Sequence, residues 1–260
     1  MKKIFQIIIW LVVGAGIVFL LSFAMTDHKQ VTCGSVNIEI TDRSGDGFIS
    51  ADDIHELLTS EFDSLHGCLL DSINTSAMAS LLNKNPYIRK AEVFKSVSGN
   101  IQIEVEREIP LVRIINKNHE NFYLAESGAV IPVSADYTPH VMVSSGLIEE
   151  SWKKVKDSVF YAATDEKASE NLLSSIHYLT RSIRSNPYLD RYVEQIYIGR
   201  NGNIELVPAD GDHVIVLGDV RGISKKLSNL MTFYRAGKPS VAEGYRTVNL
   251  KYMNQVVCKK

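Results

Sequence analysis

The residues whose types and spacing come nearest to a chemical site lie in one acidic segment, "TDRSGDGFISADDI", from Thr41 to Ile54. A calcium loop takes oxygen ligands at its first, third, fifth and twelfth positions and a glycine at its sixth. Gly47 occupies the sixth position, and aspartate stands at the twelfth where glutamate is usual. The metal-ligand candidates in this chain are therefore Asp42, Ser44, Asp46 and Asp53.

A turn that leads into a helix explains the same segment without a metal ion. Val36 to Ile40, "VNIEI", alternates apolar and polar residues and predicts a half-buried strand. Glycine, serine and aspartate favour a turn after it, Ser50 is suited to cap a helix, and Asp53 falls in the first helical turn. If the segment is a turn and a helix cap, we expect no metal centre in it. It remains the one candidate for calcium binding in the sequence.

Catalytic chemistry has no comparable support in the sequence. The chain contains no Gly-x-Ser-x-Gly, His-Glu-x-x-His or paired Cys-x-x-Cys motif and no glycine-rich phosphate loop, and no two of its seven histidines are spaced i, i+4. We therefore expect no catalytic residue and no cofactor, and predict that the protein is not an enzyme.

Three cysteines, Cys33, Cys68 and Cys258, are too few for a fold built on disulfides. In an oxidising compartment Cys33 could pair with Cys68 and leave Cys258 as a thiol. Cysteines that pack as small apolar side chains are the alternative. The sequence leaves both open.

An apolar run predicts a membrane anchor near the amino terminus. Ile4 to Met25 contains no charged residue and is long enough to cross a bilayer as a helix. Lys2 and Lys3 precede the run, so we expect residues 1–3 in the cytoplasm, a transmembrane helix at 4–25, a linker at 26–35, and the rest outside the cytoplasm. The net charge of −2 argues against nucleic-acid binding.

Beyond the linker, the patterns predict an α+β protein with two domains. Residues 36–110 predict a strand, two helices and two further strands, with the second helix through Leu82 and the last strands at Ile88 to Val97 and Ile101 to Arg107. Residues 111–258 predict a mixed or antiparallel β domain with flanking helices. There the helices are expected at Asp165 to Arg184 and Ser224 to Arg235, and a three-stranded meander at Glu194 to Gly218. Tyr245 to Cys258 closes the chain as a candidate edge strand.

Two segments, in order along the chain, resemble the bacterial cell-division family FtsQ, also called DivIB. "NPYIRKAEVFKSVSGNIQIEVEREIPLVRI", Asn85 to Ile114, is similar to the family's stretch from Asn-Pro-aromatic through a hairpin into Glu-Arg-x-Pro. "LGDVRGISKKLSNLMTFY" followed by "YRTVNLKY" is similar to its closing helix and last long strand.

The resemblance implies a POTRA domain followed by an FtsQ β domain. It also implies a non-enzymatic scaffold of the divisome at the inner membrane, with other divisome membrane proteins around it. Such a scaffold binds the single-pass proteins FtsB and FtsL and through them regulates septal peptidoglycan synthesis. The resemblance places partner binding by strand addition at Tyr245, Arg246, Thr247, Val248, Asn249, Leu250, Lys251 and Tyr252.

Three alternatives stay open beside this expectation. The closing strand could only complete the sheet and be covered by Met253 to Lys260. A POTRA-like domain also fits an envelope export or assembly component. The acidic segment would fit an exported calcium-responsive binding module.

Overall fold

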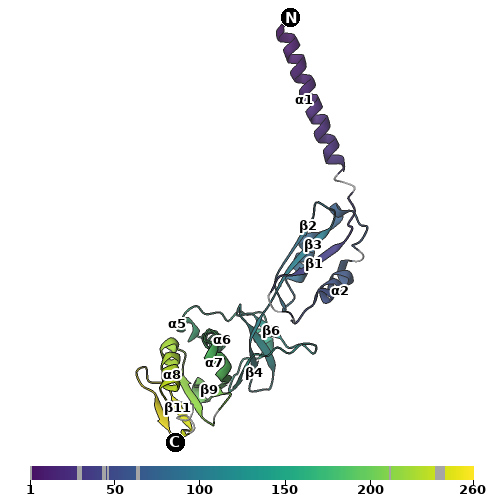
Figure 1. Ribbon diagram of the computed structural model, residues 1–260. Helices are drawn as coiled ribbons and strands as arrows, with labels where there is room; N and C mark the ends of the chain where they lie inside the picture. The colour runs from purple at the N-terminus through teal and green to yellow at the C-terminus, as the bar shows by residue number, and fades with distance from the viewer. Residues whose placement is uncertain are drawn as a thin grey trace. The chain divides into compact units, whose positions relative to one another are not determined.

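The computed structural model describes residues 2–27, 31–42, 45, 47–62, 65–210, 212–237 and 244–260. The chain forms two compact units (Figure 1). The first comprises Met1–Arg43 and Ile49–Arg107, and the second comprises Ser44–Phe48 and Glu108–Lys260.

A helix, α1, runs from Lys2 to Asp27 and contains the predicted span Ile4 to Met25. The side chains at positions 10–20 are described, and all are exposed. Among the residues that the structure describes, no helix reaches the length and apolar character of a bilayer crossing.

The first unit beyond α1 has the predicted order of strand, helix, helix, strand, strand. Its three-stranded sheet has the order β1-β3-β2, in which β3 pairs in parallel with β1 and antiparallel with β2. The elements are β1 Val36–Ile40, α2 Ala51–Phe62, the short helix η2 Leu70–Ser72, α3 Thr75–Leu82, β2 Ile88–Lys95 and β3 Ile101–Arg107. The expected helix end at Leu82 is confirmed.

The core of this unit follows from the two periodicities of the sequence. Ile101, Ile103 and Val105 alternate along β3 with polar residues, and all three are fully buried. Helices α2 and α3 place their apolar residues on the same core, with Ile54 and Met78 wholly inaccessible to solvent. The buried face of the strand and the apolar faces of the two helices therefore pack together into one small core.

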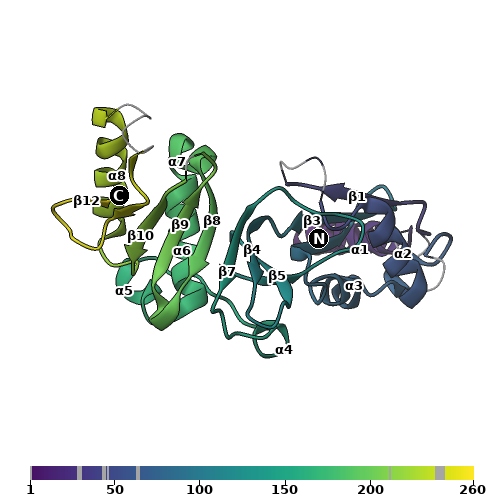
Figure 2. The same cartoon turned by 90° about the horizontal axis from the view of Figure 1, so that it is seen from below.

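The second unit is built on a nine-stranded sheet with the order β12-β11-β10-β9-β8-β7-β4-β5-β6. Figure 2 shows β10, β9, β8, β7, β4 and β5 in this order across the view. The strands are β4 Pro110–Ile115, β5 Asn121–Ala125, β6 Val130–Pro132, β7 Met142–Gly146, β8 Val193–Ile198, β9 Ile204–Pro208, β10 Val214–Gly218, β11 Thr247–Asn249 and β12 Val257–Lys259. The helices are α4 Trp152–Val155, α5 Asp165–Ala168, α6 Leu172–Arg184, α7 Pro187–Tyr192, η3 Arg200–Gly202 and α8 Ile223–Gly237.

The sheet is mixed, as predicted. Three of its pairings are parallel, namely β4 with β7, β7 with β8, and β10 with β11, and the others are antiparallel. Each parallel pairing needs a crossover, and α8 lies in the connection from β10 to β11. The α+β class and the three-stranded meander, here β8, β9 and β10, are confirmed.

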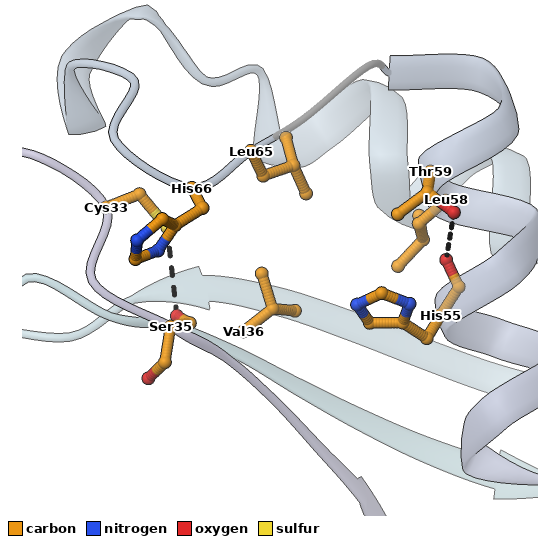
Figure 3. A pocket seen from close by; sticks show the side chains of 8 residues that line it. All are labelled: Cys33, Ser35, Val36, His55, Leu58, Thr59, Leu65 and His66. Carbon is orange, nitrogen blue, oxygen red and sulfur yellow. Dashed lines mark hydrogen bonds between the residues drawn. The ribbon is translucent and has the colours of Figure 1, made fainter.

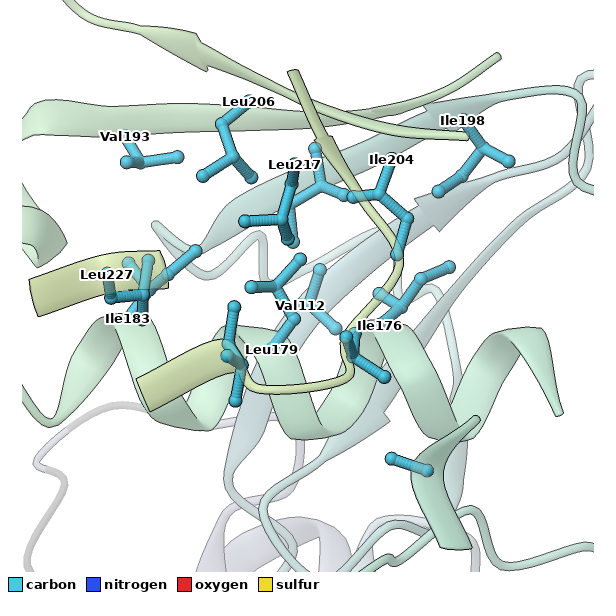
Figure 4. Packing of buried hydrophobic residues seen from close by; sticks show 14 of the residues in the cluster. Val112, Ile176, Leu179, Ile183, Val193, Ile198, Ile204, Leu206, Leu217 and Leu227 are labelled. Atoms are coloured by element: carbon cyan, nitrogen blue, oxygen red, sulfur yellow. The ribbon is translucent and has the colours of Figure 1, made fainter. Parts of the chain in front are cut away.

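The core of the second unit lies between this sheet and α6. Ile176, Leu179 and Ile183 recur at helical spacing and are fully buried. Figure 4 shows them pointing toward sheet residues such as Val112 and Leu217. The burial of a continuous apolar helix face against the sheet is the main stabilising term of this unit.

The prediction of one continuous helix in the second unit is wrong. Asp165 to Arg184 was expected as a single helix, and the structure divides it into α5 and α6. Asn171 interrupts the helix because its backbone is extended, and its side chain accepts hydrogen bonds from the backbone N–H groups of Leu173 and Ser174. It is therefore the N-cap of a new helix.

Candidate partner-binding edge

The predicted binding strand, Tyr245 to Tyr252, lies inside the sheet. Its regular part, β11, pairs in parallel with β10 on one side and antiparallel with β12 on the other. The prediction that this strand is an edge is therefore wrong for β11. The covering expected in the alternative is present, because residues within Met253 to Lys260 fold back as β12 and pair with it.

The outer edge of β12 is one end of the nine-stranded sheet, and no strand pairs with it among the described residues. Backbone groups alternate in direction along a strand. Arg246 O and Leu250 N bond to β10, at 3.0 and 2.8 Å, so the groups of Thr247 and Asn249 point toward β12. In the observed register, Lys259 and Val257 oppose these two residues, which leaves the N–H and C=O of Cys258 pointing outward.

The side chains of the predicted segment divide by exposure. Val248 and Leu250 are buried in the core of the unit. Tyr245, Thr247 and Asn249 are half-buried, whereas Arg246, Lys251 and Tyr252 are exposed. The segment thus supplies core residues and a few surface side chains, and its backbone is already paired.

The turn between β11 and β12 is held by long-range contacts. Asn229 on α8 donates a hydrogen bond of 2.9 Å to the carbonyl of Met253. Gly218 has a positive φ, and a Cβ there would lie 3.0 Å from Cγ of Lys251. Gly222 also has a positive φ, and a Cβ there would collide with the Met253 side chain. Any other residue at these two glycines would be strained by the positive φ and would move the Lys251 or Met253 side chain.

A buried lysine fixes the connection between β10 and α8. Lys226 Nζ donates to the carbonyls of Leu217 and Asp219, at 3.1 and 2.8 Å, and to Asp219 Oδ1 at 2.9 Å. Burial opposes the ionisation of Asp219, but the hydrogen bonds from Lys226 and Arg221 outweigh it, so the pKa of this carboxyl is below its ordinary value. The network positions the helix on which the turn depends.

The surface beside the edge is basic and partly apolar. Arg246, Lys251, Lys259 and Lys260 are exposed, and none forms an ion pair in the part of the chain that the structure describes. Tyr252, Met253 and Val257 expose between 41% and 54% of their surface at the same place. An extended segment with acidic and apolar side chains would find complementary groups here.

A polar cluster is buried where β10 begins. Nε2 of His213 lies 2.6 Å from Oη of Tyr234 on α8 and 3.4 Å from Oη of Tyr192. Burial lowers the pKa of His213 and raises the pKa of Tyr234. Both groups are therefore neutral near pH 7. The cluster joins α7, α8 and the start of β10, and its geometry is that of packing rather than of a reactive centre.

The acidic segment does not assemble as a metal site in the described residues. Asp42 accepts two hydrogen bonds from the Arg107 guanidinium, and only 2% of its side chain is exposed. Asp53 accepts from the backbone N and Oγ of Ser50, at 2.8 and 2.7 Å. These bonds hold the pKa of Asp53 below its ordinary value. Ser44 and Asp46 lie outside the described residues. No group of three metal-ligating side chains occurs among the described residues.

A groove that the sequence did not indicate follows the face of β4, β7 and β8, with a volume of about 840 Å³. Arg113 lies in it with its guanidinium carbon 5.8 Å from the centre of the Tyr123 ring. Gln195 donates a hydrogen bond of 2.7 Å to Ser145. Arg191, Asp190 and other charged residues of both signs line it, so the groove offers no single electrostatic preference.

Two family models match the chain in the order of its two units. A POTRA-like domain matches residues 31–106, and the model described as FtsQ/DivIB, C-terminal related, matches residues 109–259. No curated protein matches the chain. The second match alone covers more than half of the sequence and contains the sheet, α8 and the β12 edge described above. The chain therefore belongs to the FtsQ/DivIB family, whose domains indicate a role in cell division with divisome proteins as partners.

Proposed function

We propose that this protein is a non-enzymatic scaffold of the bacterial divisome that accepts an extended segment of a partner protein at the outer edge of β12. The observation that carries the proposal is the position of β12 as the terminal strand of the nine-stranded sheet. An unpaired edge offers backbone donors and acceptors that an incoming strand can satisfy.

The surface around β12 favours the addition of a strand that carries apolar and acidic side chains. The outward N–H and C=O of Cys258 provide the backbone contact, and Val257 and Tyr252 provide exposed apolar area. The cations at Arg246, Lys251, Lys259 and Lys260 favour a partner strand that carries carboxylates. Lysine on an edge strand also discourages non-specific pairing, so it favours a partner that neutralises it.

The family supports the identity of the partners. We propose that an FtsB-like protein supplies the added strand, that an FtsL-like protein accompanies it, and that septal peptidoglycan synthesis is regulated through this complex. The predicted residues Tyr245 to Tyr252 then act in two ways. Val248 and Leu250 support the sheet beneath the docking edge, and Arg246, Lys251 and Tyr252 contact the partner beside it.

We also propose that residues 4–25 anchor the protein in the inner membrane, with residues 1–3 in the cytoplasm and the two units outside it. The support is the uncharged run in the sequence, which lies within the helix α1. Protease treatment of spheroplasts tests the topology. Digestion of both units with retention of a short membrane-bound fragment is expected, and full protection of both units would contradict this arrangement.

A substitution at Cys258 tests the docking edge with a matched control. Proline removes the outward N–H of Cys258 but leaves the bonds between β11 and β12, because edge strands tolerate proline where the N–H faces solvent. Loss of one hydrogen bond together with the bulk of the ring predicts at least fivefold weaker binding of the purified FtsB and FtsL homologues of the same organism. Cys258→Ala keeps the N–H and is expected to bind within about twofold to threefold of the parent protein.

The two variants are compared by calorimetry after circular dichroism has shown unchanged folding. Equal binding by Cys258→Pro and Cys258→Ala would remove strand addition at β12 as the mechanism. Depletion in the native cells tests the broader role. Filaments without completed septa are expected. Normal division with defects in envelope-protein export would favour the export or assembly alternative.

A further inference from the structure

Two segments of the first unit run antiparallel beside each other although they are distant in the sequence. The backbone N–H of Leu70 donates to the carbonyl of Val31 at 2.9 Å, and Thr32 forms an antiparallel bridge with Leu69. One step further along the same register, the N–H of Cys33 donates to the carbonyl of Cys68 at 2.8 Å. The register thus brings Cys33 opposite Cys68, although the two residues share only this one hydrogen bond, because the N–H of Cys68 donates to the carbonyl of Leu65 at 3.4 Å.

This placement is close to the geometry of a disulfide. Opposed residues of an antiparallel ladder have Cα atoms roughly 4.5–5.5 Å apart, and disulfides join residues whose Cα atoms lie roughly 4.4–6.8 Å apart. Both cysteines are thiols in the structure: the Cys33 side chain packs in the core with its Sγ 3.7 Å from the Ser35 carbonyl, whereas Cys68 is exposed. A bond between the two sulfur atoms therefore needs rotation of the Cys33 side chain away from the core and a local closure of the two segments, without a change of register.

We propose that Cys33 and Cys68 form an intrachain disulfide that fastens the segment after α1 to the connection between α2 and α3. The proposal concerns the first unit only and does not depend on partner binding at β12. The third cysteine, Cys258, belongs to the second unit and takes no part.

The exposure of the two thiols defines the order of the chemical steps. Cys68 is exposed, whereas Cys33 is 1% exposed and lies beside His66 in the wall of a pocket of about 560 Å³ (Figure 3). A disulfide oxidant is therefore attacked first by the Cys68 thiolate, which forms a mixed disulfide and releases one thiol. The Cys33 thiolate then attacks the sulfur of Cys68 and releases the second thiol. Two protein thiols are oxidised, and one disulfide of the oxidant is reduced to two thiols.

Neighbouring contacts keep the two cysteines together while both are thiols. Gly67 N donates to the carbonyl of Cys33 at 2.9 Å, and Nδ1 of His66 lies 2.8 Å from the carbonyl of Gly34. The segment around Cys68 is thus already fixed against the segment around Cys33. Pre-organisation of this kind raises the effective concentration of the second thiol at the mixed disulfide.

The bond would close a loop of 36 residues, from Cys33 to Cys68. In the chain-entropy description, a loop of this size restricts the unfolded state enough to shift the unfolding equilibrium by roughly two to three powers of ten. Amide hydrogen exchange in β1 and α2 is expected to slow by up to this factor after oxidation. The second unit is expected to show no change.

The test uses the full-length protein in detergent, equilibrated with reduced and oxidised glutathione and then blocked with a maleimide. Peptide mass spectrometry is expected to find a linked pair that contains Cys33 and Cys68 and lacks the mass of two hydrogen atoms. The link is expected to persist in Cys258→Ser and to disappear in Cys68→Ser, whose position is exposed and tolerant.

Three results would overturn the proposal. One is a glutathione adduct at Cys68 with Cys33 still a thiol after equilibration. Another is a linked peptide that contains Cys258. The third is an intermolecular Cys68 dimer as the main oxidised product. Each is read from the same digest, so it does not depend on whether the variants fold equally well.

Discussion

The ion pair between Asp42 and Arg107 leads to a prediction that separates a structural acidic segment from a calcium site. The Asp42→Asn substitution removes the negative charge and leaves the Arg107 guanidinium, with 7% of its side chain exposed, bonded to the Ile49 carbonyl at 3.2 Å. Removal of one partner from a buried pair costs about 3–5 kcal/mol. Since small domains unfold with about 5–15 kcal/mol, the first unit would lose a large share of its stability.

Hydrogen exchange followed by mass spectrometry measures this loss within the full-length protein. At about 1.4 kcal/mol per factor of ten, exchange of the protected amides of β3 is expected to accelerate by roughly 10² to 10³-fold or more. Peptides from β9 in the second unit serve as the internal reference. Tryptophan fluorescence would not report on this sheet, because the two tryptophans are Trp10 and Trp152.

Asp53→Asn is the matched control in the same segment. Asp53 is exposed and accepts hydrogen bonds from Ser50 at the start of α2, so its loss is expected to cost only about 1 kcal/mol. The reasoning is refuted if the two variants accelerate exchange equally and if the parent protein shows the same acceleration when a calcium chelator is added. In that case a bound ion, and not the ion pair, would hold the segment.

Three further predictions concern the second unit and use denaturant unfolding followed by the fluorescence of Trp152, which packs 6.2 Å from Phe122 between ring centres. Leu179→Ala is expected to lower the free energy of unfolding by about 2–5 kcal/mol, because Leu179 is fully buried. Val159 is 66% exposed, so Val159→Ala should change that free energy by no more than about 0.5 kcal/mol. Similar losses in the two variants would contradict the assigned core. Lys226→Met is expected to cost about 1–3 kcal/mol for each carbonyl left without its donor, those of Leu217 and Asp219, and unchanged stability would argue against the network. Because burial lowers the pKa of His213, the unfolded chain binds a proton more readily than the folded chain does. The free energy of unfolding should therefore be at its full value above pH about 6.5 and fall, by about 1.4 kcal/mol per unit of pKa lowering, as the pH drops toward the folded pKa. His213→Gln should show a shallower pH profile.

The order of the elements could be predicted because it depends on local patterns. The alternation from Ile101 to Arg107 and the apolar stripe of α6 identified a strand and a helix directly. The break at Asn171 is also local, and its N-cap preference was a signal that the helical periodicity concealed. The parallel pairings were not predictable, since nothing in the sequence of β7 specifies that β4 and β8 lie beside it.

The candidate site was predictable only in part. Tyr245 to Cys258 was correctly placed at one end of the sheet, but its division into β11 and β12 was missed because the turn lacks Asn-Gly or Asp-Gly. The hydrogen bond from Asn229 on α8 holds that turn instead, and two glycines leave room for its Lys251 and Met253 side chains. The role of Asp42 was equally hidden, since its partner Arg107 is 65 positions away.

The serial dependence of the last strands links partner affinity to local stability. β12 pairs only with β11 within the described sheet, β11 depends on β10, and α8 holds the turn that joins β11 to β12. If this group of elements opens as a unit, the apparent affinity of a partner falls in proportion to the fraction that is closed. A partner bound at the edge must in return stabilise α8, although it does not touch that helix. Substitutions in the α8 contacts would therefore weaken assembly at a distance, without altering a single residue of the docking surface.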